Sequence, residues 1–350
     1  MCADMRDHIR GEIAASGPIT FARFMELALY GEDGYYDQPP IGAGGDFVTA
    51  PHVHPVFATL LARAMRQLHV ALGAPDPLRI VEMGAGDGTL ARGLLDELAD
   101  IPLAYTVLDV SPGARQALRA IPGLDGVGAE LGEPFDLLIA NELLDNLPFR
   151  LLRAGEEIGI GVNAGGDLEQ VSIGTGAGLA ALSREGAEVV PTGALALVDT
   201  IADVIGESRA YALFIDYGND GGAGGPVHGY AAHHVVEDLL MAPGRTDITA
   251  GVDFGLLSEH AGRRGLVAFS TVTQREALLA LGFDTWFEEQ LETQRTLLNA
   301  GQGVAAVKTW SDRSRASLLG DPAGLGRFRW LLLATLGLPE PPWLLDAHAP

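Results

Sequence analysis

The most chemically informative stretch of this chain is the run Glu82-x-Gly84-x-Gly86-x-Gly88, which directly follows a short apolar segment. A glycine-rich turn between a strand and a helix lets a ligand approach the backbone, because no Cβ stands in the way. A turn that binds a pyrophosphate has the spacing G-x-G-x-x-G, and Thr89 occupies the third glycine position in this chain. The spacing therefore disfavours a nicotinamide-dependent oxidoreductase.

Two acids accompany the glycine turn. Glu82 precedes it, and Asp109 closes the next apolar segment, where a carboxylate can accept the hydroxyls of a ribose. An acid beside the turn would repel a pyrophosphate and favour a cation. This arrangement is typical of methyltransferases that use S-adenosylmethionine, whose sulfonium and ammonium are positive. We predict that cofactor, held by Glu82, Gly84, Gly86, Gly88 and Asp109; the alternative is a structural turn with a capping acid.

A second polar group, within the segment "ANELLDNLP", follows the third apolar run of the chain. Asn141 and Glu142 are candidates for cofactor binding. Glu142 and Asp145 are candidates for catalysis, because one or two carboxylates can hold a planar guanidinium bidentately and localise its attacking lone pair. The alternative is that Asp145 caps the following helix and Glu142 contacts only the cofactor.

A glycine-rich loop, "GAGGDFVTAP", is a third candidate contact. Asp46 could accept a hydrogen bond from the ammonium or ribose of the cofactor, with Thr49 beside it; the alternative is a plain turn capped by Thr49. The histidines show no metal-ligand spacing of the H-x-x-x-H or Cys/His kind, so we predict no metal site. The histidines left without an assigned role are His52, His54, His228, His233 and His234.

The bulk composition limits the partners and the compartment. The chain has 350 residues and a formal net charge of −23, which disfavours nucleic acid and suits either a basic protein partner or mere solubility. We find no apolar run long enough to span a membrane and no leader at the N-terminus. The single cysteine, Cys2, cannot form an internal disulfide, so a reducing cytoplasm is the expected location.

The order of expected elements predicts an α/β fold with a doubly wound parallel sheet. Strands are expected over 78–83, 103–110 and 135–142, separated by helices over 89–98 and 111–120, and another strand over 209–218. An antiparallel hairpin is expected over 150–174, sheet-like material over 265–273 and 303–310, and an amphipathic last helix within 328–343. The predicted domains are a helical cap with a glycine-rich loop (1–75), a cofactor-binding core (76–218), an inserted subdomain (219–265), and the rest of the core sheet with a C-terminal helix (266–350).

The chain resembles the MidA (mitochondrial dysfunction protein A) family, which is related to a mitochondrial complex I assembly factor. The resemblance extends from about residue 16 to 310 and rests above all on "GDFVTAP" together with "ANELLDNLP". It implies a class I methyltransferase (Rossmann-like) fold with an N-terminal helical cap, a smaller added subdomain and S-adenosylmethionine as cofactor. For the mitochondrial member it implies methylation of an arginine on a partner protein.

The expected function is therefore S-adenosylmethionine-dependent methylation of a protein side chain, with arginine favoured. Two alternatives stay open: a small-molecule O- or N-methyltransferase, and a catalytically silent assembly factor that binds S-adenosylmethionine. The chain departs from the family pattern at His52, where Glu is common, at His54-Pro55, and at Gly251, where a histidine is common. These departures concern the cap and the added subdomain, and they bear on the substrate more than on the cofactor.

Overall fold

The centre of the protein is an eight-stranded sheet. The structure is a computed structural model that describes residues 5–36, 49–221, 225–231 and 234–348. The strand order is β16-β18-β10-β5-β2-β3-β4, and β17 also pairs with β18. Neighbouring strands from β10 to β4 run parallel, whereas β16, β17 and β10 are antiparallel to β18. The strands are β2 (Leu78–Met83), β3 (Leu103–Leu108), β4 (Gly126–Gly128), β5 (Leu137–Asn141), β10 (Tyr211–Asp216), β16 (Val267–Ala268), β17 (Val272–Thr273) and β18 (Arg329–Ala334).

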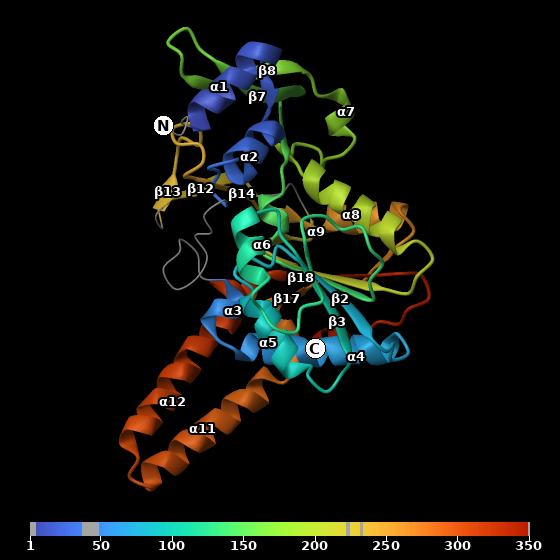
Figure 1. Cartoon of the computed structure of the whole chain (residues 1–350), viewed down its shortest axis with the longest axis vertical. Helices are drawn as coiled ribbons and strands as arrows, with labels where there is room; N and C mark the ends of the chain where they lie inside the picture. The colour runs from blue at the N-terminus through green and yellow to red at the C-terminus, as the bar shows by residue number, and fades with distance from the viewer. Residues whose placement is uncertain (1–4, 37–48, 222–224, 232–233, 349–350) are drawn as a thin grey trace.

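Helices cover both faces of this sheet (Figure 1). One face packs against α4 (Val56–Ala71), α5 (Thr89–Glu97), α6 (Pro112–Leu118), α10 (Gln274–Ala280) and α13 (Pro342–Ala347). The other face packs against α8 (Thr192–Ile205) and α9 (Phe254–Arg263). Ser111 caps α6 with Pro112 at its first position, as its sequence predicts. The prediction of a doubly wound α/β fold is confirmed.

The predicted last helix within 328–343 is wrong, because most of its apolar run forms β18. Trp330, Leu332 and Ala334 enter the core on one face of the sheet, and Leu331 and Leu333 enter the core on the other. A strand buried on both faces has a continuous apolar run, which periodicity alone cannot distinguish from a buried helix. Only the short α13 near the C-terminus is helical.

The expected strand over 303–310 is also wrong, because this segment begins α12 (Gly303–Ala316). α12 packs against α11 (Phe283–Asn299), and the pair forms a hairpin that projects from the rest of the molecule (Figure 1). The apolar residues Val304, Val307 and Trp310 recur at helical spacing. The segment is short and its composition favours a strand, so the helical spacing was not recognised.

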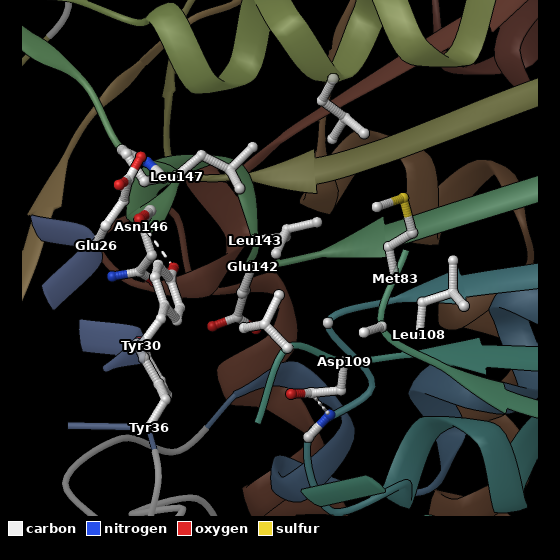
Figure 2. A pocket seen from close by; sticks show the side chains of 16 residues that line it. Glu26, Tyr30, Tyr36, Met83, Leu108, Asp109, Glu142, Leu143, Asn146 and Leu147 are labelled. Atoms are coloured by element: carbon white, nitrogen blue, oxygen red, sulfur yellow. Dashed lines mark hydrogen bonds between the residues drawn. The ribbon is translucent and has the colours of Figure 1, made fainter. Parts of the chain in front are cut away.

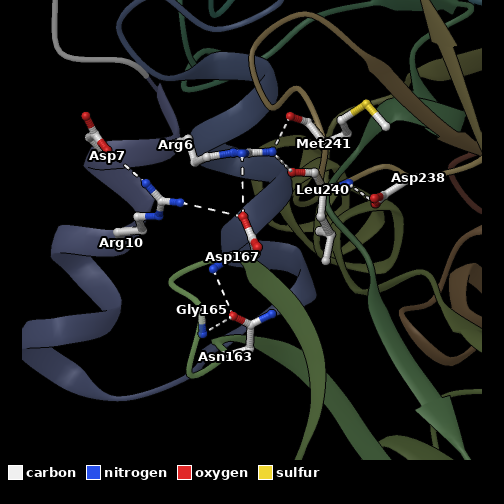
Figure 3. Close-up of polar contacts among 9 residues, drawn as sticks. All are labelled: Arg6, Asp7, Arg10, Asn163, Gly165, Asp167, Asp238, Leu240 and Met241. Carbon is white, nitrogen blue, oxygen red and sulfur yellow. Dashed lines mark hydrogen bonds and ion pairs between the residues drawn. The ribbon is translucent and has the colours of Figure 1, made fainter.

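A second sheet, of order β1-β7-β6-β9 with β8 beside β7, packs against α1 (Met5–Ser16) and α2 (Phe21–Tyr30). Its strands are β1 (Ile19–Thr20), β6 (Arg150–Arg153), β7 (Glu156–Val162), β8 (Leu168–Thr175) and β9 (Val189–Val190), with α7 (Ala177–Ala180) between the last two. The predicted antiparallel hairpin is confirmed as β7 and β8. Asp167 beside its turn lies 3.9 Å from both Arg6 and Arg10 of α1 (Figure 3).

A third, small sheet lies near the carboxyl ends of the central strands. It consists of β13 (His234–Val236), β12 (Val227–Ala231) and β14 (Asp247–Ala250), and the pair β11 (Gly218–Asn219) and β15 (Val252–Asp253) adjoins it in sequence. β14 contacts the turn η1 (Leu144–Asn146) that follows β5. α1 and α2 thus pack on the second sheet, whereas α4 packs on the central one. The division of the chain into four domains stays a prediction.

Candidate active site

The glycine turn after β2 has the left-handed backbone that glycine adopts without strain. φ is +69° at Gly84 and +75° at Gly88. A Cβ at Gly88 would lie 2.3 Å from Ile121 Cδ1 and 2.8 Å from Leu118 Cδ2, so this glycine permits close packing of the start of α5 against the end of α6 and the residues that follow it. A Cβ at Gly84 would lie 3.0 Å from Leu143 Cδ1, and Gly84 lines the cavities above the turn. Gly88 therefore serves packing, whereas Gly84 lies at the cavity wall, where its role in ligand binding stays a prediction.

The two predicted acids lie on either side of this turn. Asp109 accepts a hydrogen bond from the backbone N–H of Gly86 at 2.9 Å (Figure 2). It accepts a second from the backbone N–H of Ser111 at 2.8 Å. Glu82 is buried and accepts a hydrogen bond from the Tyr105 hydroxyl at 2.6 Å. Burial raises the pKa of Glu82 to about 7 and also raises the pKa of Asp109. Because burial disfavours the charged form of both acids, a positively charged ligand beside them would stabilise their ionised state.

Two cavities adjoin the turn. The larger, about 330 Å³, has apolar walls from Met83, Leu108, Val110 and Leu143, with Asp109 at its edge (Figure 2). The smaller, about 70 Å³, lies between the turn and α3 (Ala50–Val53) and is lined by Glu82, Asn141 and Glu142 among others. Asn141 Oδ1 is buried without a hydrogen-bond partner. An apolar slot with a carboxylate for ribose, next to an acidic recess, fits the nucleoside and the cationic part of S-adenosylmethionine.

α3 faces the glycine turn across the smaller cavity, and His52 connects α3 to the turn. His52 Nε2 lies 3.0 Å from Asp87 Oδ2, and His52 Nδ1 lies 2.8 Å from Thr49 Oγ1. The hydrogen bond with Asp87 raises the pKa of His52. Thr49 therefore lies at the wall of the smaller cavity, where the sequence predicted it, whereas Asp46 lies outside the described residues.

Glu142 lines three cavities, namely these two and a third of about 380 Å³. Its φ is +54°, which is unusual for a residue with a side chain. Its Oε1 accepts hydrogen bonds from the backbone N–H of Ala50 at 3.0 Å and from Asn141 Nδ2 at 3.2 Å. Burial raises its pKa to about 7. The strained backbone thus directs this carboxylate to the junction of the cavities.

The third cavity is lined by acidic and aromatic side chains and by Arg327, whose guanidinium lies 4.5 Å from the centroid of the Tyr217 ring. Asp145 lies in η1 on its wall, where its Oδ2 accepts a hydrogen bond from Thr249 at 2.8 Å and its buried Oδ1 has no partner. Asp247 of β14 accepts hydrogen bonds from the Tyr36 hydroxyl at 3.0 Å and from Asn146 at 2.8 Å. Burial raises the pKa of Asp145 to about 6 and that of Asp247 to about 7. The aromatic wall includes Tyr35, Tyr36, Tyr217, Tyr230 and Phe328.

The sequence predicted part of this acidic cavity. Asp145 and Glu142 lie on its wall together, as their spacing after the strand implied. Asp247 was not identified, although it opens the family block "DITAGVDF", because nothing in the local pattern brings β14 beside η1. His228 lies on the cavity wall, His234 is exposed, and His233 is outside the described residues. Among the described residues no group of three or more His, Cys, Asp or Glu side chains could hold a metal.

Comparison with known proteins identifies the family. Residues 60–272 match the model of the family described as "Putative S-adenosyl-L-methionine-dependent methyltransferase". The chain belongs to this family. Membership confirms the predicted enzyme class and the predicted cofactor, and it agrees with the resemblance to MidA proteins. The match spans β2, the glycine turn, η1 and β14, and so covers part of the lining of each of the three cavities.

Relatives of this methyltransferase cover most of its length. The zebrafish "Protein arginine methyltransferase NDUFAF7, mitochondrial" is 27% identical over 84% of this chain and 80% of its own. The human protein of the same name is 25% identical over 80% of this chain and 74% of its own. A Burkholderia thailandensis protein, crystallised with S-adenosyl-homocysteine bound, is 28% identical, has a TM-score of 0.79, and covers 99% of this chain and 94% of its own.

The expected cytoplasmic location is wrong, because the curated relatives that the chain matches over most of its length are named as mitochondrial proteins. The inference rested on a single cysteine and on the composition of the N-terminal residues. A lone cysteine indicates a reducing compartment but does not identify which one. In the part of the chain that the structure describes, no helix combines the length and apolarity needed to cross a membrane.

Proposed function

We propose that this methyltransferase modifies the guanidinium of an arginine side chain in a protein. The observation that carries the proposal is the convergence of Glu142, Asp145 and Asp247 on one cavity that shares Glu142 with the cofactor cleft; in addition, Asp145 Oδ1 is buried without a hydrogen-bond partner. A buried carboxylate oxygen without a donor is costly unless a ligand supplies one. A guanidinium supplies up to five N–H donors in a planar fork.

The charge of the cavity supports a cationic acceptor. Glu142, Asp145 and Asp247 come from three separate segments and converge on one space, and burial raises the pKa of each. An arriving cation would lower these pKa values again and stabilise the ionised acids. Arg327, on the same wall, lies over the Tyr217 ring at 4.5 Å from its centroid, so a tyrosine face there accepts a planar guanidinium. The names of the relatives, protein arginine methyltransferases, agree with such an acceptor.

The proposed cofactor-binding residues and acceptor-binding residues have different roles. S-adenosylmethionine supplies an electrophilic methyl group on a positively charged sulfur. Thr49, Glu82, Gly84, Gly86, Gly88, Asp109 and Asn141 are the residues proposed to hold it. Glu142, at the junction of the cavities, holds one side of the acceptor guanidinium. Asp145 accepts the proton that the attacking nitrogen loses when its bond to the methyl carbon forms and the carbon–sulfur bond breaks.

The test is methyl transfer from S-adenosylmethionine with an isotopically labelled methyl group to three matched peptides. One peptide contains arginine, the second has lysine at that position, and the third has citrulline, which keeps the shape but lacks the charge. We expect label in the arginine peptide alone, located by fragment mass spectrometry on the guanidinium. Label in the lysine peptide, or label only in small amines and alcohols offered as competitors, would contradict the proposal. Tight S-adenosyl-homocysteine binding without transfer to any acceptor would instead support the silent assembly factor.

A further inference from the structure

Arg327, in the turn that precedes β18, places a guanidinium on the wall of the third cavity, which we call the acceptor cavity. Arg327 is exposed, and its guanidinium lies 4.5 Å from the centroid of the Tyr217 ring. The carboxylates on the same wall belong to Glu142, Asp145 and Asp247. A cavity proposed to bind a cation therefore carries a cation of its own, to which the proposed methyl transfer assigns no role.

The contact with Tyr217 holds the guanidinium of Arg327 by its flat face. Stacking of this kind engages none of the five N–H donors of the group. Within the part of the chain that the structure describes, the Arg327 side chain forms no hydrogen bond and no ion pair. Arg329, two residues further on, does form an ion pair, with Asp220 at 3.1 Å. The donors of Arg327 are therefore available to a ligand, and the ring keeps them in place.

The acids and this guanidinium lie toward different ends of the acceptor cavity. Asp247, Thr249 and Gly251 alternate along β14 and the residue after it, and all three line the cavity. Asp145 bonds to Thr249, in the middle of this stretch, at 2.8 Å. A Cβ at Gly251 would lie 3.4 Å from the ring of Tyr217. At about 3.3 Å per residue, the stretch from Asp247 to Gly251 covers about 13 Å, with carboxylates at its start and the stacked guanidinium at its end.

A cation in this position affects which peptides the acceptor cavity binds well. A guanidinium that approaches Glu142 and Asp145 also approaches the like charge of Arg327, which weakens its binding. A carboxylate near the incoming arginine offsets this repulsion, because Arg327 can hold it through charge-assisted, bidentate hydrogen bonds. An extended peptide advances about 3.4 Å per residue, so a carboxylate up to about three residues away can reach the other end of the cavity.

We propose that Arg327 selects acceptor proteins in which a carboxylate lies within about three residues of the methylated arginine. This selection rests on the proposed function and adds the chemistry of the sequence around the acceptor. The formal net charge of −23 attracts basic segments of any sequence. Arg327 distinguishes among them, because it favours an arginine with an acidic neighbour over an arginine in a polybasic run.

Three matched series of peptides test this selection. Each peptide contains one arginine, and one position up to three residues away is aspartate in the first series, asparagine in the second and lysine in the third. A further pair has the arginine near a free or an amidated C-terminus, which distinguishes a side-chain carboxylate from one at the chain end. For the wild type, we expect the carboxylate to raise kcat/KM roughly fivefold or more at one position at least, chiefly by lowering KM.

Variants of Arg327 should change this preference in a defined direction. Arg327→Gln should abolish the preference for the carboxylate, and Arg327→Glu should reverse it in favour of the lysine series. Arg329→Gln is the matched control, because it removes a nearby cation that pairs with Asp220 and does not line the cavity. This control should keep the wild-type preference. Melting curves verify that each variant folds.

Calorimetric binding of the same peptides, with S-adenosyl-homocysteine present, separates this selection from the proposed function. If arginine is not methylated in any peptide, the proposed function fails, and the binding preference alone decides the role of Arg327. Equal binding and equal kcat/KM for the aspartate and asparagine series, and for the two C-termini, overturn the selection even if arginine is methylated. A preference that Arg327→Gln leaves unchanged overturns it as well. If the peptides neither bind nor react, the function and the selection are both wrong.

Discussion

The backbone N–H of Ala50 donates a hydrogen bond to the side chain of Glu142 at 3.0 Å, although the two residues are 92 positions apart in the chain. Ala50 opens α3, which covers the glycine turn, and Glu142 follows β5 with a φ of +54°. This contact joins the cover of the cofactor cleft to the carboxylate that also lines the acidic cavity. In the proposed mechanism, Glu142 thereby links enclosure of the cofactor to binding of the acceptor.

Glu142→Gln removes the charge of this carboxylate and keeps its shape. We expect kcat/KM for methyl transfer to fall by about 10²-fold or more, because the acceptor guanidinium loses a charged hydrogen-bond partner. The affinity for S-adenosyl-homocysteine, measured by calorimetry, should change much less. Glu97→Gln, at an exposed carboxylate bonded to Thr59, serves as the control and should keep wild-type activity. Wild-type turnover in Glu142→Gln with unchanged cofactor affinity would remove Glu142 from the mechanism.

Asp145→Asn should stabilise the unliganded protein above neutral pH. Burial raises the pKa of Asp145 from 3.8 to about 6, so the folded state binds this proton more tightly than the unfolded state. Stability therefore falls as the pH rises from about 4 to about 6, and the deficit persists above that range. The penalty is on the order of 3 kcal/mol. Melting curves at about pH 8 and about pH 4 check this: the variant should melt higher than wild type only at the higher pH.

Thr249→Val is the control for that experiment, because it removes the hydrogen bond to Asp145 and leaves the carboxyl group in place. It should not raise stability at either pH. An Asp145→Asn variant less stable than wild type at about pH 8 would show that the ionised carboxylate is paired in the folded state, and the unpartnered Oδ1 could then no longer support the proposed acceptor site.

His52→Ala should weaken cofactor binding. His52 bridges Asp87 of the glycine turn and Thr49 at the start of α3, so its loss frees the cover of the smaller cavity. We expect the Kd of S-adenosyl-homocysteine to rise roughly fivefold, equivalent to about 1 kcal/mol. His260→Ala breaks a comparable pair with Asp199, at 2.7 Å, away from the cleft and should leave the Kd unchanged. If both variants bind S-adenosyl-homocysteine with the same Kd, the attachment of α3 by His52 does not contribute to cofactor binding.

Gly88→Ala should destabilise the fold by about 2–4 kcal/mol, through backbone strain and overpacking together. The added Cβ meets Ile121 at 2.3 Å and Leu118 at 2.8 Å, and the backbone there has a φ of +75°. Gly73→Ala is the matched control, since its φ is +92° but a Cβ there meets nothing within 4 Å. Gly73→Ala should therefore cost only the backbone strain, about 1–2 kcal/mol, in chemical denaturation. A similar loss in both variants would mean that strain alone, and not packing of α5, requires glycine at position 88.

Local sequence patterns were sufficient for the core fold and for the cofactor turn. The apolar runs that form β2, β3, β5 and β10, the cap Ser111, and the glycine spacing after β2 all act through neighbours in the chain. The approach of Asp247 to the acidic cavity could not be inferred in this way. It depends on β14 lying beside η1. These segments are far apart in the chain, since the hydrogen bond from Asn146 to Asp247 joins residues 101 positions apart.

The two mistaken elements have a common physical cause. β18 is apolar at every position from Trp330 to Ala334 because both of its faces are buried, and a helix of that length can have the same composition. In α12 the apolar residues Val304, Val307 and Trp310 are exposed, so their helical spacing does not coincide with a buried face. Periodicity reports which side of an element is apolar, and only packing decides whether that side is inside.

A crystal structure with bound S-adenosyl-homocysteine and an arginine-containing peptide tests the central claim most directly. We expect the nucleoside over Gly84 and Asp109, the sulfur at the junction marked by Glu142, and the peptide guanidinium in the cavity walled by Asp145 and Asp247. A cleft above the glycine turn filled by side chains, or a sulfur that faces away from the acidic cavity, would contradict the claim.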